Sequence, residues 1–354
     1  MRGKKLALAA AVVALALTVL VGGGFAMTNR SSAKTPAGAE SHAQGAVKVA
    51  VVTDIGGLND RGFNHLSNVG RLRAQKQLKV QTRVFVTGSA AERSPNLQVA
   101  AQQGYNLIIG VGFLMFDSLN NVAPAFPNVK FAGVDVPYAV LDKKPSNVRG
   151  LIFKEQEAGY LVGYIAGLTV KAQKGADVVS AVGANKVPAI VRFIAGYRAG
   201  VKRADAKARV LVDYANDPTF SDQAKCKETA LTQIARGSKV VFQVAGQCGL
   251  GALNAAKEKK VWAIGVDADQ SFFGSFVLTS ATKKVDVSVF DTVKEFKRNP
   301  SGFRTRFDKV FSVKNGGVGY GKISARAPHR AAMIKKVEAI KKLIARGKIK
   351  IPTQ

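Results

Sequence analysis

The residues best suited to bind a ligand lie between positions 51 and 64, where a β-branched run ends and a helical pattern begins. Two acids, two amides, a pair of adjacent glycines and one aromatic ring occur there: Asp54, Gly56, Gly57, Asn59, Asp60, Phe63 and Asn64. A carboxylate can accept hydrogen bonds from sugar hydroxyls or an amine, and Phe63 can stack on a planar ring. Asn59 or Asp60 alone is typical of a helix cap. The whole combination indicates a binding site.

Residue types that support catalysis are scarce. Three histidines (His42, His65 and His329) and two cysteines are too few, and too far apart, for a multi-ligand zinc site. The glycines at 110–112 lack the third glycine of a dinucleotide fingerprint, and 246–251 lacks the Lys-Ser/Thr ending of a phosphate loop. Asp267 and Asp269 are more typical of a ligand contact plus a cap than of a cation site. We therefore expect no enzyme activity, no cofactor and no metal.

Strand and helix patterns alternate from residue 47 onward. Short β-branched runs predict nine strands, at 47–53, 83–86, 106–111, 129–134, 148–153, 178–182, 210–214, 239–244 and 261–266. Stretches of helical length separate many of them, at 61–77, 155–172, 188–203, 222–236 and 250–259. This alternation predicts an α/β fold in which mostly parallel sheets are flanked by helices.

Nine strands are too many for one unit of this kind, and the pattern divides near residues 153–156. We expect a first lobe at about 47–153 plus later segments, and a second lobe at about 156–270, with the two interleaved. Ligands of open α/β sheets lie beyond the carboxyl ends of the strands. The cleft between the lobes is therefore the expected site.

The N-terminal 27 residues have the order of an export signal. Arg2, Lys4 and Lys5 precede an apolar run at 6–27, which predicts a cleaved signal peptide or an uncleaved N-terminal anchor. Residues 28–46 are rich in small and polar types and predict a flexible tether. We expect an exported protein, periplasmic or at the cell surface. No cysteine lies near this segment, so it is not a cysteine-anchored lipoprotein.

The charge of the chain is strongly basic. Its 354 residues include 53 Lys and Arg against 23 Asp and Glu, a formal net charge of +30. Such a balance usually points to nucleic acid or anionic lipid. The basic residues are scattered, however, and no aromatic platform for single strands lies among them. We expect no nucleic-acid polymer as partner, and a solvated surface suited to a polyanionic envelope.

Segment 51–64 resembles the signature of the basic membrane protein family, the PnrA-like substrate-binding proteins of ABC transporters. Further matches follow along the chain: GYNLIIGVGF at 104–113, FAGVD at 131–135, EQEAGYLVG at 155–163, FIAGYRAG at 193–200, GLG at 249–251, IGVDADQ at 264–270, VLTS at 277–280 and GKIKIP at 347–352. They cover most of residues 47–352. The resemblance implies a two-lobed periplasmic-binding-protein-like fold of type I, over residues 47–354.

The resemblance also implies a role for individual residues. The family holds a purine base between two aromatic rings, which match Phe63 and Phe220. Asp54, with Asn64 beside it, matches the aspartate that contacts the base, and Asp267 and Lys283 match the residues that contact the ribose hydroxyls. The other expected ligand-binding residues are Asp60, Gly112, Phe113 and Gly246.

The function implied is capture of a small ligand, a purine nucleoside, by a monomer that delivers it to the permease of an ABC importer. A sensor whose closed form is read by a membrane receptor is the alternative, and a secreted nucleoside-processing enzyme is a third. The chain departs from the family pattern at Cys248, in a glycine-rich loop. Cys226 and Cys248 are the only cysteines. Export permits a disulfide between them, and the sequence leaves this pairing open.

Overall fold

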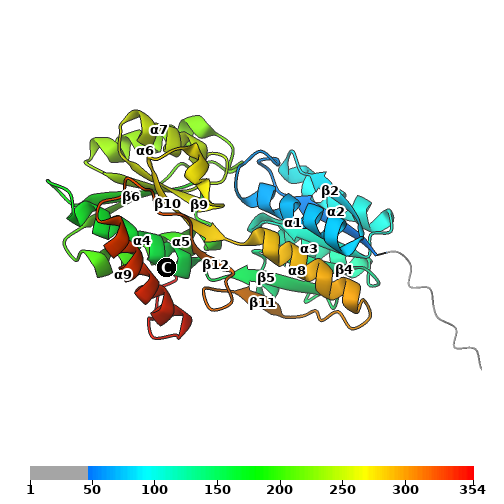
Figure 1. Cartoon of the computed structure of the whole chain (residues 1–354). Helices are drawn as coiled ribbons and strands as arrows, with labels where there is room; N and C mark the ends of the chain where they lie inside the picture. Colours follow the sequence, from blue (N-terminus) through cyan, green and yellow to red (C-terminus); the bar gives the residue numbers. More distant parts are fainter. Residues whose placement is uncertain (1–46) are drawn as a thin grey trace, which may run out of the picture. The chain divides into compact units, whose positions relative to one another are not determined.

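The computed structural model describes residues 47–354 (Figure 1). The predicted export signal or anchor at 1–27 and the tether at 28–46 lie outside the described residues. Within 47–354, no helix is both long and apolar enough to cross a membrane.

The first lobe is built on a six-stranded parallel sheet with the order β11-β5-β4-β3-β1-β2. Its strands are β1 (Lys48–Thr53), β2 (Gln81–Val86), β3 (Leu107–Val111), β4 (Lys130–Val134), β5 (Val148–Phe153) and β11 (Asp308–Phe311). Side chains alternate between the two faces of β1: Val49 and Val51 pack into one apolar cluster, and Ala50 and Val52 into another. Helices therefore cover both faces: α1 (Phe63–Leu78), α2 (Arg93–Gln102), α3 (Phe116–Val122) and α8 (Val285–Arg298).

The second lobe is built on another six-stranded sheet, with the order β12-β10-β9-β8-β6-β7. Its strands are β6 (Val178–Gly183), β7 (Arg209–Tyr214), β8 (Val240–Val244), β9 (Trp262–Asp267), β10 (Val277–Lys283) and the antiparallel β12 (Val318–Tyr320). Figure 1 shows α6 (Gln223–Ala235) and α7 (Gly249–Glu258) on one face of the sheet, and α4 (Glu155–Lys171), α5 (Pro188–Ala204) and α9 (Arg330–Ala345) on the other. Short 3-10 helices are η1 (Ala90–Glu92), η2 (Phe113–Met115), η3 (Ala123–Ala125), η4 (Tyr138–Val140) and η5 (Gln270–Phe273).

The two sheets repeat one strand order, in which β1 to β5 correspond to β6 to β10. The predicted architecture of two mostly parallel sheets flanked by helices is confirmed. All nine predicted strands occur, with bounds shifted by at most two residues. The prediction lacked β10, β11 and β12. After β10 the chain returns to the first lobe, where α8 packs against α1 and β11 joins the edge of the first sheet. It then crosses back to the second lobe, where β12 joins the second sheet and α9 follows.

Helices α4 and α5 are packed with their backbones in contact. A Cβ atom built at Gly163 would lie 2.1 Å from the carbonyl oxygen of Tyr197, and one at Gly200 would lie 2.1 Å from that of Tyr160. Real side chains do not tolerate such distances, so only glycine permits this approach. The close packing holds the N-terminus of α4, which begins at Glu155, against α5 beside the cleft.

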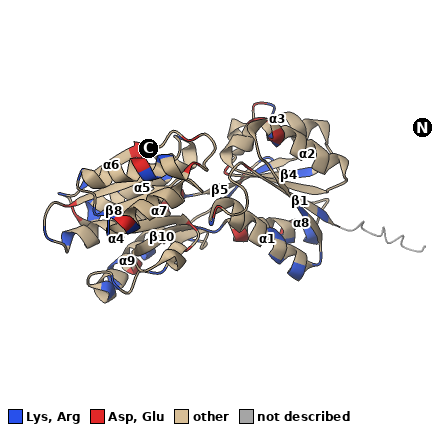
Figure 2. Ribbon diagram, turned by 90° about the horizontal axis from the view of Figure 1, so that it is seen from above, with Lys and Arg blue, Asp and Glu red and all other residues tan. Residues whose placement is uncertain are grey.

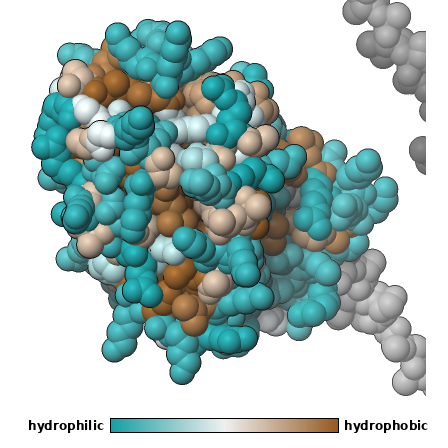
Figure 3. All heavy atoms as spheres, turned by 60° about the vertical axis from the view of Figure 1, so that its left-hand side comes forward, coloured by the Kyte–Doolittle hydropathy of each residue, from teal (hydrophilic) through white to brown (hydrophobic). Residues whose placement is uncertain are grey.

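Basic residues occur on helices of both lobes (Figure 2). The face of the second lobe in Figure 3 is mainly hydrophilic, with apolar patches between the hydrophilic side chains. The charge is thus distributed over the molecule, as the scattered sequence positions indicate.

Candidate functional site

A cavity of about 110 Å³ lies at the carboxyl ends of the strands and is lined by residues of both lobes. All ten residues predicted for ligand binding line it: Asp54, Asp60, Phe63, Asn64, Gly112 and Phe113 from the first lobe, and Phe220, Gly246, Asp267 and Lys283 from the second. The structure therefore brings together residues separated by up to 229 positions in the sequence, Asp54 and Lys283 being the extremes.

The loop after β1 is fixed by its own polar side chains. The Asn64 side-chain amide donates to the carbonyl oxygens of Asp54 (3.1 Å) and Ile55 (3.2 Å). The Asp54 carboxylate accepts a hydrogen bond from Arg93 Nε at 2.7 Å, within an ion pair that is largely shielded from solvent. Arg93 was not predicted as a site residue. It holds Asp54 in place, since a charge-assisted hydrogen bond of this length is strong.

The Asp60 carboxylate caps helix α1. It accepts hydrogen bonds from the backbone amides of Gly62 (3.1 Å), Asn64 (2.7 Å) and His65 (2.9 Å). Burial raises the pKa of Asp60, and these hydrogen bonds oppose the rise. Capping is therefore its role in the structure, and direct contact with a ligand stays a prediction.

Aromatic rings line the cavity from both lobes. Phe63 begins α1, and Phe113 begins η2 and stacks on Phe116 with ring centroids 5.2 Å apart. Phe220 follows β7, and Phe193 belongs to α5. Phe193 was not predicted as a site residue, because its position in an apolar helical pattern is equally typical of core. Both lobes therefore contribute aromatic side chains to the cavity lining.

A buried cluster of charges connects the lobes. Lys283 Nζ, at the end of β10, donates to Asp135 Oδ2 at 2.6 Å and to Glu155 Oε1 at 2.9 Å. Asp135 follows β4 in the first lobe, so the first of these ion pairs crosses the cleft. Arg192 Nε donates to Glu155 Oε2 at 2.6 Å. Burial alone would lower the pKa of Lys283, but the carboxylates of Asp135 and Glu155 outweigh burial and raise it, so its ammonium is charged.

Asp267, at the end of β9, lies beside this cluster without a partner of its own. Its side chain is buried and lines the cavity, and no described residue donates a hydrogen bond to its carboxylate. Burial raises the pKa of Asp267 to about 7; the Lys283 ammonium opposes the rise, and the carboxylate of Asp135 adds to it. The site therefore contains a cavity-lining carboxylate that accepts no hydrogen bond from the described residues, and Asp135 Oδ1 beside it is a buried oxygen without a hydrogen-bond partner.

Asp135, Glu155 and Arg192 are charged residues that the sequence prediction missed. A signal existed for Asp135, because Gly-Val-Asp at 133–135 repeats Gly-Val-Asp at 265–267. The repeats end β4 and β9, which hold the same place in the two strand orders, and both aspartates adopt a positive φ, 64° and 62°. Asp269, by contrast, caps η5 by accepting from Ser271 N, as expected of a cap.

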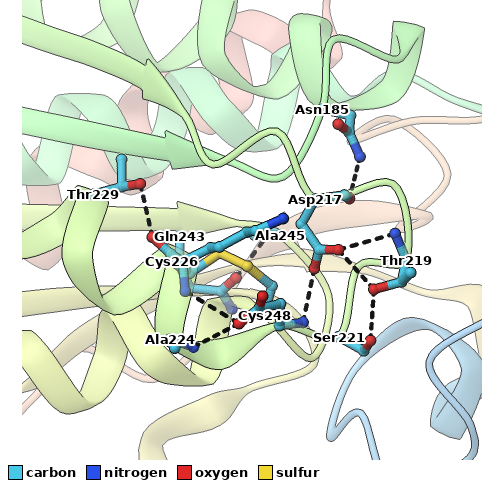
Figure 4. Close-up of a disulfide and its surroundings, with 12 residues drawn as sticks. Asn185, Asp217, Thr219, Ser221, Ala224, Cys226, Thr229, Gln243, Ala245 and Cys248 are labelled. Carbon is cyan, nitrogen blue, oxygen red and sulfur yellow. Dashed lines mark hydrogen bonds between the residues drawn. A yellow bond between two sulfur atoms is a disulfide. The ribbon is translucent and has the colours of Figure 1, made fainter.

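The two cysteines form a disulfide that joins α6 to the end of the cavity-lining segment 245–247 (Figure 4). The Cα atoms of Cys226 and Cys248 are 5.5 Å apart, and both side chains are fully buried. The pairing that the sequence left open is thus present. In residues 47–354, no group of three or more His, Cys, Asp or Glu side chains is arranged to hold a metal ion.

Comparison with known proteins places these features in a family. The profile described as "ABC transporter substrate-binding protein PnrA-like" matches residues 47–354. The "ABC transporter nucleoside-binding protein BmpA" of Lactococcus lactis subsp. cremoris is 34% identical over 332 residues, which are 87% of this chain and 90% of the relative. An "uncharacterized lipoprotein" of Pyrococcus abyssi is 32% identical over 82% of this chain and 71% of the relative. A solved solute-binding protein of an ABC transporter system from Aeropyrum pernix K1 has a TM-score of 0.76 at 27% identity and covers 87% of this chain and 94% of that one.

Proposed function

Because the chain belongs to the PnrA-like family of ABC transporter substrate-binding proteins, we propose that it captures a purine nucleoside between its lobes and delivers it to an ABC importer. The observation that carries the proposal is one cavity that combines aromatic rings from both lobes with a buried carboxylate and ammonium. The name of the Lactococcus relative, a nucleoside-binding protein, supports the same ligand class.

The rings suit a flat heterocycle. Phe63 and Phe220 come from opposite lobes, so a base between them would gain stacking on both faces only when the lobes are closed. Closure is then the mechanism of capture, because a ligand that contacts both lobes binds the closed state better than the open state. The cavity volume of about 110 Å³ suits one small molecule and not a nucleic-acid strand.

The charged residues suit the ribose. An ammonium has three N–H donors, and Lys283 uses two of them on Asp135 and Glu155. Its third donor is available to a ligand hydroxyl, and Asp267 offers an unused acceptor. Two neighbouring hydroxyls can therefore donate to Asp267 and accept from Lys283 at the same time, by charge-assisted hydrogen bonds.

Titration calorimetry with inosine, adenosine, hypoxanthine and ribose tests the ligand class. We expect binding of a nucleoside, and loss of about 1 to 3 kcal/mol of binding free energy in Phe63→Ala, the range for one stacked base. The matched control is Phe272→Ala, because that ring is 59% exposed and does not line the cavity. If ribose binds and no nucleoside does, the ligand assignment is wrong. Chromatography of the recovered ligand separates a binder, which returns it intact, from an enzyme.

Membership of the family supports proposals for the partners and the location of this chain. Its members are extracytoplasmic, and we propose that this chain is exported through residues 1–27 and acts as a monomer. Its two cysteines are joined to each other, which leaves neither for a lipid anchor. Light scattering on residues 47–354 checks the monomer, and co-purification with the permease checks the importer.

A further inference from the structure

Two loops of the second lobe meet at the cavity and determine where the Phe220 ring lies. Phe220 belongs to the loop 215–222 between β7 and α6, and Gly246 to the loop 245–248 between β8 and α7. Cys248 N donates to the carbonyl oxygen of Phe220 at 2.9 Å. A Cβ atom at Gly246 would lie 3.3 Å from the same oxygen. The position of Phe220 therefore depends on the position of the second loop.

The backbone at this meeting point is in an uncommon conformation. Phe220 has a φ of 58°, which is unfavourable for a bulky residue and persists only where the surroundings hold it. Asp217 fixes the turn itself, because its carboxylate accepts from Thr219 N (3.0 Å) and Asp222 N (2.8 Å) (Figure 4). These hydrogen bonds stay within the loop 215–222. They do not attach it to the loop 245–248.

One hydrogen bond, from Cys248 N to the Phe220 carbonyl oxygen, joins the two loops, and the disulfide adds a covalent link beside it. Cys226 lies in the first turns of α6, shortly after Phe220, and Cys248 ends the loop that carries Gly246. The bond thus joins the two segments directly behind the contact between Phe220 and Gly246. Both sulfurs are inside the core, away from the cavity surface, so they do not touch a ligand themselves.

We propose that the Cys226–Cys248 disulfide is a positioning element of the binding site, which holds the Phe220 ring in place before the ligand arrives. Removal of a crosslink that only stabilised the fold would affect all of the second lobe alike. Removal of a positioning crosslink affects the two loops first, and it weakens binding because the ring must then be ordered when the ligand binds. The effect on affinity rests on the proposed function, and the effect on the loops does not.

The test compares wild-type protein with Cys226→Ala/Cys248→Ala and with Val337→Ala. Val337 is fully buried in α9 and does not line the cavity, so its truncation lowers stability without altering the loops. Hydrogen exchange is measured on ligand-free protein at residues 215–222 and at the Cys248 amide. We expect exchange about tenfold faster there in the double variant, and unchanged in Val337→Ala. If the double variant does not fold, wild-type protein expressed and kept under reducing conditions replaces it.

Calorimetry with inosine provides the second measurement. We expect the double variant to bind about tenfold more weakly than wild type, within the range for an impaired stacking ring, and Val337→Ala to bind normally. Equal exchange at the two loops in wild type and double variant, or equal inosine affinity, overturns the proposal. If wild-type protein does not bind inosine, the nucleoside assignment fails, and hydrogen exchange alone then decides whether the disulfide holds the loops.

Discussion

The unpartnered carboxylate of Asp267 should make the ligand-free protein less stable than it would be with a neutral side chain. Asp267→Asn tests this with little change of shape, and asparagine also tolerates the left-handed backbone at this position, where φ is 62°. The expected effect depends on pH, because only the charged form of Asp267 is unfavourable in the buried site.

The magnitude follows from the pKa. Burial raises the pKa of Asp267 from 3.8 to about 7 in the folded state. Between these values the folded state binds a proton that the unfolded state has lost, so this group lowers the free energy of unfolding as the pH rises. One pKa unit corresponds to about 1.36 kcal/mol. Asp267→Asn should therefore equal wild type near pH 4 and exceed it by about 4 kcal/mol at pH 8.

The assay is urea unfolding of both ligand-free proteins at intervals between pH 4 and pH 8. Other titrating groups are shared, so they cancel in the difference between the two curves. Asp269→Asn is the control, because its carboxylate accepts hydrogen bonds from Ser271 N and Lys322 N and its replacement should destabilise the protein. A difference between Asp267→Asn and wild type that stays constant with pH would contradict this prediction, since it would mean that Asp267 ionises in the folded protein at the same pH as in the unfolded chain.

Three further changes give distinct expected results. Gly163→Ala should lower the free energy of unfolding by about 1 to 3 kcal/mol in thermal or urea unfolding, because its Cβ would meet the Tyr197 carbonyl oxygen at 2.1 Å; normal stability would show that α4 and α5 can separate. Lys283→Met should cost about 3 to 5 kcal/mol by the same assay, since it leaves Asp135 and Glu155 buried without their ammonium; a neutral result would contradict the ion-pair geometry. Cys226→Ala/Cys248→Ala should cost about 3 kcal/mol, the expected value for a loop closed over 22 positions, and an unchanged unfolding midpoint would argue against the crosslink.

The elements of the fold were predictable where their sequence pattern is local. Buried parallel strands are continuous apolar runs, and seven of the nine predicted strands are buried along nearly their whole length: β1, β3, β4, β5, β6, β8 and β9. The other two, β2 and β7, lie at sheet edges and are partly exposed. The short strands β11 and β12 have only four and three residues, too few to show a period, and are held by pairing with β5 and β10. Their place in the two sheets depends on the return of the chain to each lobe, which no local pattern encodes.

Site residues could be predicted from the sequence where they follow a strand. The hydrogen-bond and ion-pair partners of these residues could not, where the two lie far apart in the sequence. Segment 51–64 combines several polar and aromatic types in one turn, so it stands out without knowledge of the fold. Lys283 bonds to Asp135 and Glu155 across 148 and 128 positions, and these pairs exist only after both sheets are assembled. Arg93 and Arg192 were also missed because their carboxylate partners are distant in the sequence. A single arginine on a helix usually faces solvent, so neither position stood out.

The internal repeat places two equivalent aspartates, Asp135 and Asp267, at the cavity, and the two have different partners. Asp135 and Asp267 end corresponding strands with the same backbone conformation, yet only Asp135 receives a hydrogen bond from Lys283. The Lys283 ammonium therefore pairs with Asp135 across the two lobes. The Asp267 carboxylate has no such partner and lines the cavity. A buried acceptor without a donor is unfavourable in the empty protein, and a ligand hydroxyl that supplies the donor removes this cost. We therefore expect the ribose hydroxyls to contribute much of their binding free energy through Asp267. Removal of the ribose 2′ and 3′ hydroxyls from the nucleoside should weaken binding more in wild type than in Asp267→Asn, as measured by titration calorimetry.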